Sequence, residues 1–308
     1  MATDRTVRIH LGPAVLDTAR AGRHNFLNRL TEALRAGGFE VSYRSNSYAE
    51  RVATAALPGW SMFEMEPPEG ERSLVFRKAY VAPFWQIDRT DKRWDWDVAK
   101  KKFRINDKHR PVAEHFAAYW RNRLYSSQKE AVSRDGSIYV PLQARLLEQR
   151  PFQAAAPVDM LRILLSRYPG RPVNATLHPK ITYPEEELAE LGRLGRSFPA
   201  LTVSREASAA MLARCDCLVT ENSAVALEAL FFRKPVLLFA GIDFHHACAS
   251  AWRDGLDAAF AQFESAEPDY DGYLWWYLQR QCLNAGREDF HARAVKRLNA
   301  LGLDLRVR

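Results

Sequence analysis

The segment from Cys217 to Phe239 constrains the fold of this chain more than any other stretch. Residues 217–219 are an apolar run that predicts a buried strand, and a polar turn follows at residues 220–223. An apolar helix is expected over residues 224–230, and a second short strand over residues 236–239. A strand, a helix and another strand in this order are typical of a parallel sheet that is covered by helices.

The polar turn Thr220-Glu221-Asn222-Ser223 is expected where the carboxyl end of a strand meets the amino terminus of a helix. Open α/β sheets bind their ligands outside this edge. Backbone N–H groups and the helix dipole favour an anion such as a phosphate there. The turn therefore predicts a site for an anionic, nucleotide-linked ligand.

The same alternation of strands and helices recurs along the chain. In the first part, a strand at residues 7–11, a helix at 24–36 ending at Gly37-Gly38, and a strand at 39–43 predict a Rossmann-like unit without the GxGxxG fingerprint. A second series begins at Ile138. The fold class that follows is α/β, with two Rossmann-like domains, an interdomain cleft and a helical C-terminal tail. We place the domains at residues 1–135 and 136–308.

The region from residue 56 to 107 has a weaker pattern. Residues 74–76 and 80–82 are short apolar runs that predict strands, and residues 84–97 combine tryptophans with aspartates. Near the other end of the chain, aromatic side chains surround a predicted helix at residues 273–278. Packing against the protein core is the favoured interpretation of that helix, ahead of a ligand platform.

Charge and cysteine content narrow the class of protein. The 308-residue chain has a net charge of +7, and its basic residues are scattered apart from Lys100-Lys101-Lys102. This excess suits an anionic substrate, a membrane surface or nucleic acid, of which nucleic acid ranks last because no recognition motif is present. The four cysteines form no CxxC pair, and no apolar stretch of about 18 residues occurs. We therefore expect a cytoplasmic protein, with peripheral attachment to the inner face of the membrane left open.

Three polar features are expected at the carboxyl ends of strands in the second half of the chain. These are Gln143, His178-Pro179 and the turn at residues 220–223. In a parallel sheet such ends lie along one edge, so the three could line a single crevice. Each feature alone is a weak signal, but their ordered recurrence favours a binding site.

The residues Val140-Pro141-Leu142-Gln143, His178-Pro179 and Asn222-Ser223, followed by Glu228-Ala229-Leu230 and Lys234-Pro235-Val236, resemble the capsule polysaccharide biosynthesis family. That family includes Kdo transferases, and the motifs are more distantly similar to those of bacterial sialyltransferases. The resemblance covers residues 137–246. One departure is that the Asp usual after the Gln motif is absent, and Glu148 is the nearest carboxylate.

The resemblance implies a GT-B-like glycosyltransferase of capsular, cell-surface polysaccharide synthesis in bacteria. It would transfer an acidic sugar such as Kdo from a CMP-activated donor to a glycan or glycolipid acceptor. His178 would donate a hydrogen bond or proton to the departing phosphate, Ser223 would hold the phosphate oxygens, and Glu228 would accept from the ribose. The expected donor-binding residues are Gln143, His178, Pro179, Thr220, Asn222, Ser223, Glu228, His245 and His246.

A base that deprotonates the acceptor hydroxyl is expected from the N-terminal domain. Asp88 and Asp95 are the catalytic candidates there, with Asp91, Asp97 and His10 as further choices. No metal-ligand cluster is visible, so neither a metal nor another cofactor is expected. His245 and His246 are neighbours in the chain, and we expect their rings to point to different sides.

Two alternatives remain open at this stage. One is a GT-B transferase that uses a UDP- or GDP-sugar, because the sequence does not reveal how the base is read. The other is a non-catalytic module that binds glycan within a polysaccharide assembly machine. Binding measured with a panel of nucleotides distinguishes a UDP- or GDP-sugar donor from a CMP-sugar donor. Formation of a product distinguishes a transferase from a non-catalytic module.

Overall fold

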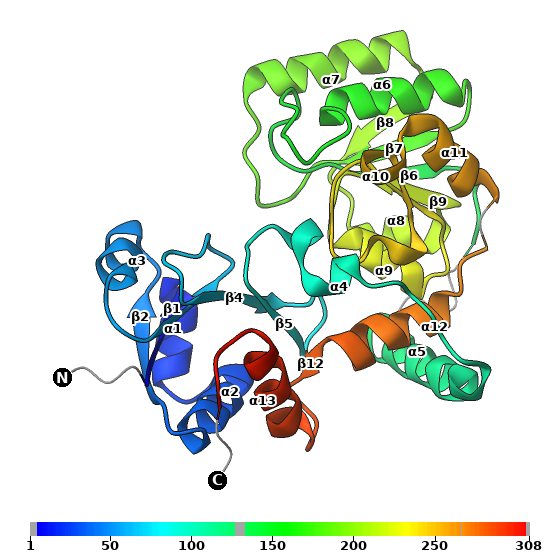
Figure 1. The fold of residues 1–308 in the computed structure, drawn as a ribbon. Coiled ribbons are helices and arrows are strands. Elements are labelled where there is room, and N and C mark those ends of the chain that lie inside the picture. The colour runs from blue at the N-terminus through cyan, green and yellow to red at the C-terminus, as the bar shows by residue number, and fades with distance from the viewer. Residues whose placement is uncertain (1–4, 127–132, 266, 306–308) are drawn as a thin grey trace. The chain divides into compact units, whose positions relative to one another are not determined.

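The computed structural model of the chain describes residues 5–126, 133–265 and 267–305. It contains two six-stranded sheets, and each sheet forms the centre of one compact unit (Figure 1). The first unit comprises Met1–Lys100 and Tyr277–Arg308, and the second comprises Lys101–Trp276. The expectation of two α/β units is confirmed, whereas the interdomain cleft that we expected stays a prediction.

The first sheet has the strand order β12-β5-β4-β3-β1-β2. Strands β2, β1, β3 and β4 run parallel, and β5 is antiparallel to both of its neighbours. Helices lie between β1, β2 and β3 in the chain, whereas residues 65–72, which join the parallel strands β3 and β4, contain no helix. The strands are β1 (Thr6–Leu11), β2 (Glu40–Ser45), β3 (Trp60–Glu64), β4 (Ser73–Lys78), β5 (Phe84–Asp88) and β12 (Leu283–Asn284).

Helices cover the first sheet through apolar stripes. In α2 the residues Phe26, Leu27, Leu30 and Leu34 recur at helical spacing and are buried. The ring of Phe26 stacks on that of Trp85 in β5, with 4.1 Å between the centroids. The helices of this unit are α1 (Pro13–Arg20), α2 (Asn25–Ala36), α3 (Tyr48–Ala55), η1 (Arg93–Asp95), α4 (Asp97–Lys100) and α13 (Phe290–Ala300).

The helical C-terminal tail that the sequence predicted is present, and its last part packs in the first unit. Phe290 and Leu298 of α13 are buried in the core that β1, β4 and α2 form. β12 adds an antiparallel strand beside β5. The predicted division placed this tail with residues 136–308, because a helical pattern shows that a helix is amphipathic and not which sheet it covers.

The second sheet is parallel throughout, with the order β11-β10-β9-β6-β7-β8. From β6 the chain adds β7 and β8 on one side, and then returns to add β9, β10 and β11 on the other. This is the doubly wound order of dinucleotide-binding folds. The strands are β6 (Ile138–Pro141), β7 (Val173–Thr176), β8 (Leu201–Ser204), β9 (Cys217–Thr220), β10 (Val236–Leu238) and β11 (Ala249–Ser250).

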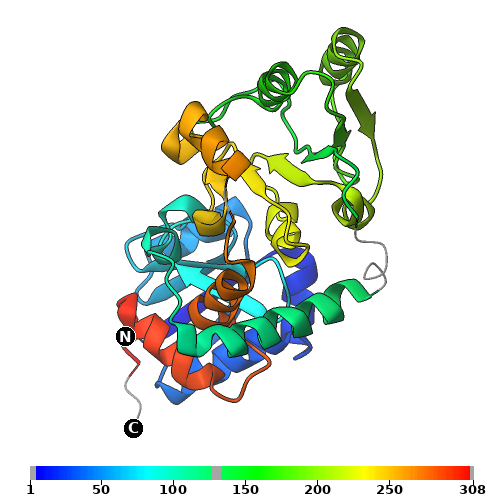
Figure 2. The same ribbon diagram turned by 90° about the vertical axis from the view of Figure 1, so that its right-hand side faces the viewer.

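The helices of the second unit are best followed in Figure 2, where α5 is seen along its length. Near the boundary between the units the chain continues from α12 into a π-helix, η5 (Trp275–Gln281). The other helices are η2 (Asp107–His109), α5 (Arg110–Tyr125), α6 (Pro157–Arg167), α7 (Glu185–Ser197), α8 (Ser208–Arg214), α9 (Val225–Phe231), η4 (His245–Ala247), α10 (Ala251–Asp254), α11 (Leu256–Ser265) and α12 (Tyr270–Leu274).

Two sequence-based expectations have clear outcomes. The strand expected at residues 80–82 is wrong, because Tyr80 has a left-handed φ of 64° and lies in a turn. The strand is instead β5 (Phe84–Asp88), where aromatic side chains obscured the alternation. The aromatic helix at residues 273–278 is a packed element as expected, since Tyr273 and Tyr277 are both fully buried.

The four cysteines are free and buried. Within the described residues, no helix combines the length and the apolar composition that a membrane crossing requires.

Candidate functional site

The carboxyl ends of β6 and β9 meet at the centre of the second sheet. β6 pairs with β7 on one side and with β9 on the other, so the winding of the sheet reverses between β6 and β9. The hydroxyl of Thr220 at the end of β9 donates to the carbonyl of Pro141 at the end of β6, at 3.0 Å. In open α/β sheets the ligand binds at this point of reversal. The structure thus places Gln143 and the turn at residues 220–223 beside the expected ligand position, and His178 follows β7, the next strand.

Gln143 follows β6 and carries an unused acceptor. Its Oε1 is buried and accepts no hydrogen bond within the described part of the chain. The loop that contains it is anchored, because the N–H of Leu146 donates to Oε1 of the buried Glu187 in α7 at 2.7 Å. A buried acceptor without a partner costs free energy of about 1–3 kcal/mol unless a water or a ligand satisfies it.

Glu221 is a second buried group with unused hydrogen-bonding capacity. Its exposed fraction is 1%, and neither carboxylate oxygen accepts a hydrogen bond from a residue that the structure describes. The nearest cation is Arg150, whose Nη2 lies 3.7 Å from Oε2. Burial outweighs this attraction and raises the pKa of Glu221 to about 8. At neutral pH the carboxyl group is therefore mostly protonated, and can both donate and accept.

The loop after β6 brings two further polar side chains into this region. Gln153 forms an antiparallel bridge with Ala240, which follows β10, and its Nε2 is buried without a partner. The Nε of Arg150 is also buried and has no hydrogen-bond partner among the described residues. The backbone N–H of Arg150 donates to Oε1 of Gln153 at 2.6 Å. Arg150, Gln153 and Glu221 were not among the site residues predicted from the sequence. Of the three, only Glu221 gave a signal, through its place in the polar turn.

His178 is exposed and its ring orientation is fixed by the backbone. The N–H of Lys180 donates to Nδ1 of His178 at 3.2 Å, and the N–H of His178 donates to the hydroxyl of Tyr183 at 2.8 Å. Because Nδ1 accepts, the neutral ring carries its proton on Nε2. His178 therefore presents a hydrogen-bond donor to solvent, and Pro179 beside it is exposed as well.

Two side chains of the polar turn hold the turn in place, and a third can reach a ligand. Nδ2 of the buried Asn222 donates to the carbonyl of Gly241 at 3.2 Å, and the Thr220 hydroxyl is committed to Pro141. Ser223 is half-buried, and its Oγ accepts from the N–H of Val225 at 3.3 Å. The hydroxyl proton of Ser223 remains available to a ligand, whereas the side chains of Asn222 and Thr220 hold the turn in place.

Glu228 lies inside α9 and is engaged by another helix. Its carboxylate accepts a hydrogen bond from the hydroxyl of Tyr125 in α5, and burial raises the pKa of Glu228. A ribose contact by Glu228 would have to share this carboxylate with Tyr125.

His245 and His246 lie in η4, and their rings stack with 4.2 Å between centroids and 20° between planes. The expectation that adjacent rings point to different sides is wrong, because the residues form a 3₁₀ turn and not an extended strand. Nδ1 of His245 contacts Nη1 of Arg253 at 2.5 Å. Nε2 of His246 donates to the carbonyl of Lys101 at 2.9 Å. Both rings are thus held by protein partners within the second unit.

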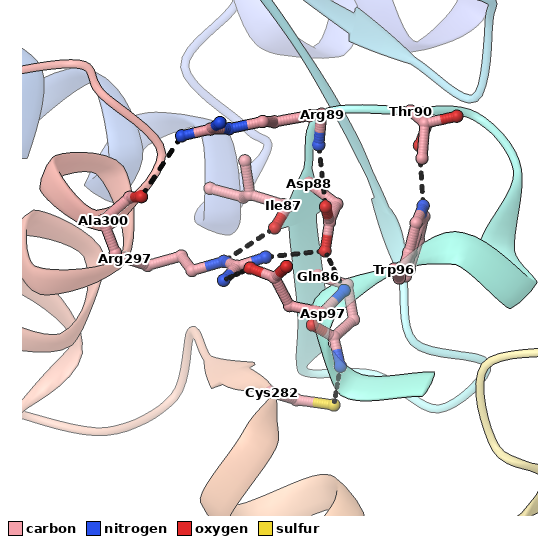
Figure 3. A network of polar contacts seen from close by, with 10 residues as sticks. All are labelled: Gln86, Ile87, Asp88, Arg89, Thr90, Trp96, Asp97, Cys282, Arg297 and Ala300. Atoms are coloured by element: carbon pink, nitrogen blue, oxygen red, sulfur yellow. Dashed lines mark hydrogen bonds and ion pairs between the residues drawn. The ribbon is translucent and has the colours of Figure 1, made fainter. Parts of the chain in front are cut away.

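In the first unit, Asp88 is the centre of a closed polar network (Figure 3). Its Oδ1 accepts from the N–H of Arg89 at 2.8 Å, and its Oδ2 accepts from the N–H of Asp97 at 2.9 Å. Nη2 of Arg297 in α13 donates to Oδ2 at 2.6 Å, and Nη1 donates to Asp97 at 2.6 Å. Burial, opposed by Arg297, raises the pKa of Asp88. The network ties the C-terminal helix to β5.

The topology also sets the aspartates apart from the ligand-binding edge of the first sheet. β5 is antiparallel, and Asp88 pairs with Val75 near the beginning of β4. Asp88 therefore lies toward the edge at which the parallel strands begin. Asp95 is half-buried in η1 and Asp91 is exposed. His10 is fully buried, with Nδ1 3.1 Å from the carbonyl of Ser45 and Nε2 3.2 Å from the Thr54 hydroxyl.

Glu64 is a carboxylate that does lie at the carboxyl edge of the first sheet. It ends β3, and its carboxylate accepts from the N–H of Gly12, which follows β1. β1 lies between β2 and β3, so this sheet also reverses its winding there. Burial raises the pKa of Glu64, and the next residue, Met65, has a left-handed φ of 58°. No strand was expected at residues 60–64, and Glu64 was not among the predicted site residues.

Within residues 5–126, 133–265 and 267–305, no three His, Cys, Asp or Glu side chains are arranged to hold a metal ion. Independence of a metal stays a prediction for this protein.

Known proteins resemble this chain in fold and not in sequence. No protein-family model matches the chain, and no curated protein matches it. Solved structures do match. The beta Kdo 2,7 transferase of KpsC from Thermosulfurimonas dismutans superimposes with a TM-score of 0.52 at 11% identity, covering 87% of this chain and 88% of that chain.

The beta Kdo 2,4 transferase of the same KpsC gives a TM-score of 0.50 at 13% identity, covering 88% of this chain and 89% of that chain. A further match is the wall teichoic acid polymerase TagF, with a TM-score of 0.28 and 10% identity over 98% of this chain and 85% of that chain. The two KpsC structures confirm the predicted GT-B-like fold class. The fold is therefore the one that the resemblance of the motifs implied.

Proposed function

We propose that this protein is a cytoplasmic glycosyltransferase of cell-surface polysaccharide synthesis. It transfers an acidic sugar such as Kdo from a CMP-activated donor to a glycan or glycolipid acceptor. The fold supports this proposal, because the chain shares it with two transferases whose names specify Kdo. The fold by itself does not define chemistry, so the proposal depends on the residues at the point of reversal of the second sheet.

The observation that carries the proposal is the group of unsatisfied buried polar atoms at that point. Gln143 follows β6 and Glu221 follows β9, and both have acceptors without partners. Arg150 and Gln153 add buried donors on the loop that follows β6. Native proteins satisfy more than about 90% of such groups with protein or water partners, so a cluster of exceptions at a ligand-binding edge supports a site where ordered water or a polar ligand completes it.

The residues with available donors suit the departure of a nucleotide. When the bond between the sugar and the phosphate breaks, negative charge grows on the phosphate oxygens. The Nε2–H of His178 and the hydroxyl of Ser223 can each donate to that charge. Removing one such donor typically costs about 10²–10³ in rate, because the hydrogen bond strengthens as the charge develops. The acceptor hydroxyl also loses a proton, and Glu64 is better placed than Asp88 to receive it at a ligand-binding edge.

The test of the donor is a thermal-shift and calorimetric panel of CMP, UMP, UDP and GDP. CMP at about 100 times its Kd should stabilise the protein by about 2.7 kcal/mol. Gln143→Leu should abolish the shift, and Glu148→Gln, on an exposed residue of the same loop, should leave it unchanged. A shift with UDP or GDP alone would show that the donor is a UDP- or GDP-sugar and not a CMP-sugar. The absence of a shift with every nucleotide would refute the proposed function.

A non-catalytic glycan-binding module remains the second candidate, on one observation. The carboxylate usual after the Gln motif is absent, and Glu148, the nearest one, is exposed and paired with Arg145 at 3.1 Å. The candidates differ in turnover. A transferase releases CMP from CMP-Kdo in the presence of acceptor, whereas a module binds glycan and releases none.

A further inference from the structure

Helix α5 (Arg110–Tyr125) presents apolar side chains to solvent. Val112 is 55% exposed and Tyr119 is 51% exposed. These residues are seven positions apart, with the half-buried Phe116 between them and the exposed Arg123 one turn beyond Tyr119. Spacings of three, four and seven residues place these side chains in one stripe along the helix. We call Val112, Phe116, Tyr119 and Arg123 the α5 stripe.

The orientation of the stripe is fixed by the opposite face of the helix. Ala113, Ala117 and Trp120 of α5 are buried, and α5 lies beside α12 in both ribbon views (Figures 1 and 2). Two ion pairs join α5 to α12 and the residue before it. Nη1 of Arg110 lies 2.9 Å from Asp269, and Nη2 of Arg121 lies 3.2 Å from Asp271. The helix therefore cannot turn its stripe inward without losing these contacts.

The segment that contains this helix carries a large share of the net positive charge of the chain. Residues 101–125 contain seven Lys or Arg and two Asp or Glu, a net charge of +5, while the whole chain has +7. Lys102, Arg104 and Lys108 are exposed on the segment that leads into α5, and none of them forms an ion pair with a described residue. Since Arg110 and Arg121 are already paired, the unpaired charge lies on that leading segment and on Arg123.

We propose that the α5 stripe and the basic segment 102–108 bind the protein to an anionic lipid surface. Amphipathic helices of this kind lie in the interface, with apolar and aromatic side chains at the headgroup level and basic side chains near lipid phosphates. A soluble polyanion would use the basic residues and gain nothing from Val112 or Tyr119. The combination of both therefore favours a lipid surface. The proposal goes beyond sugar transfer, because it assigns an interaction surface outside the strand-end site.

The experiment is co-sedimentation of the full chain with vesicles of phosphatidylcholine, alone or with about 30% phosphatidylglycerol. The partition coefficient should be about tenfold higher or more for the anionic vesicles, and should fall as the salt concentration rises. The double variant K102E/R104E should lower binding about tenfold. The control R20E/R35E makes the same change in net charge on exposed residues of α1 and α2, and should lower binding less than threefold.

The apolar part is tested at constant charge with V112S/Y119S, which should also lower binding about tenfold. Should this variant lose its thermal transition, Val112→Ser alone serves, since Val112 is the more exposed of the two. Equal binding to both vesicles, or an equal loss with R20E/R35E, overturns the proposal. So does competition by soluble dextran sulfate together with no effect of V112S/Y119S, which identifies a polyanion site. No sugar donor is present, so the outcome is independent of the proposed transferase activity.

Discussion

Two buried carboxylates, Asp88 in the first unit and Glu221 in the second, sit at strand ends and have opposite surroundings. Asp88 is 4% exposed and accepts from two backbone N–H groups and from Arg297. Glu221 is 1% exposed, and among the described residues its oxygens accept no hydrogen bond and have only the Arg150 guanidinium 3.7 Å away. Burial alone therefore does not separate a structural carboxylate from one in the proposed binding site. The difference lies in whether the protein itself supplies the partners.

Mutations at the Asp88 network and at the strand-end site of the second unit should have different consequences. The network at Asp88 contributes to stability, because removing one member leaves a buried charge without compensation. The strand-end site of the second unit is unsatisfied in the protein alone, so residues there should affect binding and turnover more than folding. Three experiments test this contrast.

The largest effect is expected for His178→Ala. His178 is exposed, and among the described residues its side chain forms one hydrogen bond, which Nδ1 accepts from the N–H of Lys180. Turnover with CMP-Kdo should fall by about 10²–10⁴-fold, or about 3–5 kcal/mol in the barrier, with the Tm shifted by less than a few degrees. His178→Asn, which keeps a donor, should retain part of the rate. A loss of Tm comparable to the loss of activity would contradict the division between the two units.

The next largest effect is expected for Arg297→Ala. The variant leaves Asp88 buried with only its backbone partners, and unfolding by urea should show a loss of about 3 kcal/mol. Arg287→Ala removes an exposed pair with Asp289 in the same region, and should cost less than about 0.5 kcal/mol. If the two variants behaved alike, the network at Asp88 would not be what holds the C-terminal helix to β5.

The smallest of the three effects is the pH dependence that Glu221 confers. Its pKa is about 8 in the folded protein and has an ordinary value of 4.5. Between these values the unfolded chain loses the proton while the folded protein keeps it, so the stability from this group is full below pH 4.5 and is lost as the pH rises through 8. The variant Glu221→Gln has no titrating group at this position, so its stability should not fall with pH on this account. Relative to the native protein, the variant should gain about 2 kcal/mol between pH 6.5 and pH 9 in urea titrations. A difference that is constant over that range would show that Glu221 is ionised throughout.

Much of the second unit was predictable because its elements are local and regular. Short stretches of mainly apolar residues, followed by polar turns, predicted the strands that became β6, β7 and β9, together with the residues at their carboxyl ends. The edge that Gln143, His178 and Ser223 share follows directly from parallel pairing. The first unit was less predictable, because β3 and β5 carry aromatic and charged residues in place of an alternating pattern.

The sequence by itself determined the class of fold and the strand-end residues of the second unit, because hydrophobic periodicity and turn chemistry act over a few neighbouring positions. Tertiary structure alone decided which polar atoms are left without partners. Thr220 and Glu221 are adjacent in one turn, yet the Thr220 hydroxyl is committed to Pro141 while the carboxyl group of Glu221 accepts nothing. It also decided that Asp88 meets Arg297, 209 positions away in the chain. Such pairings depend on the packing of distant segments, which no local pattern records.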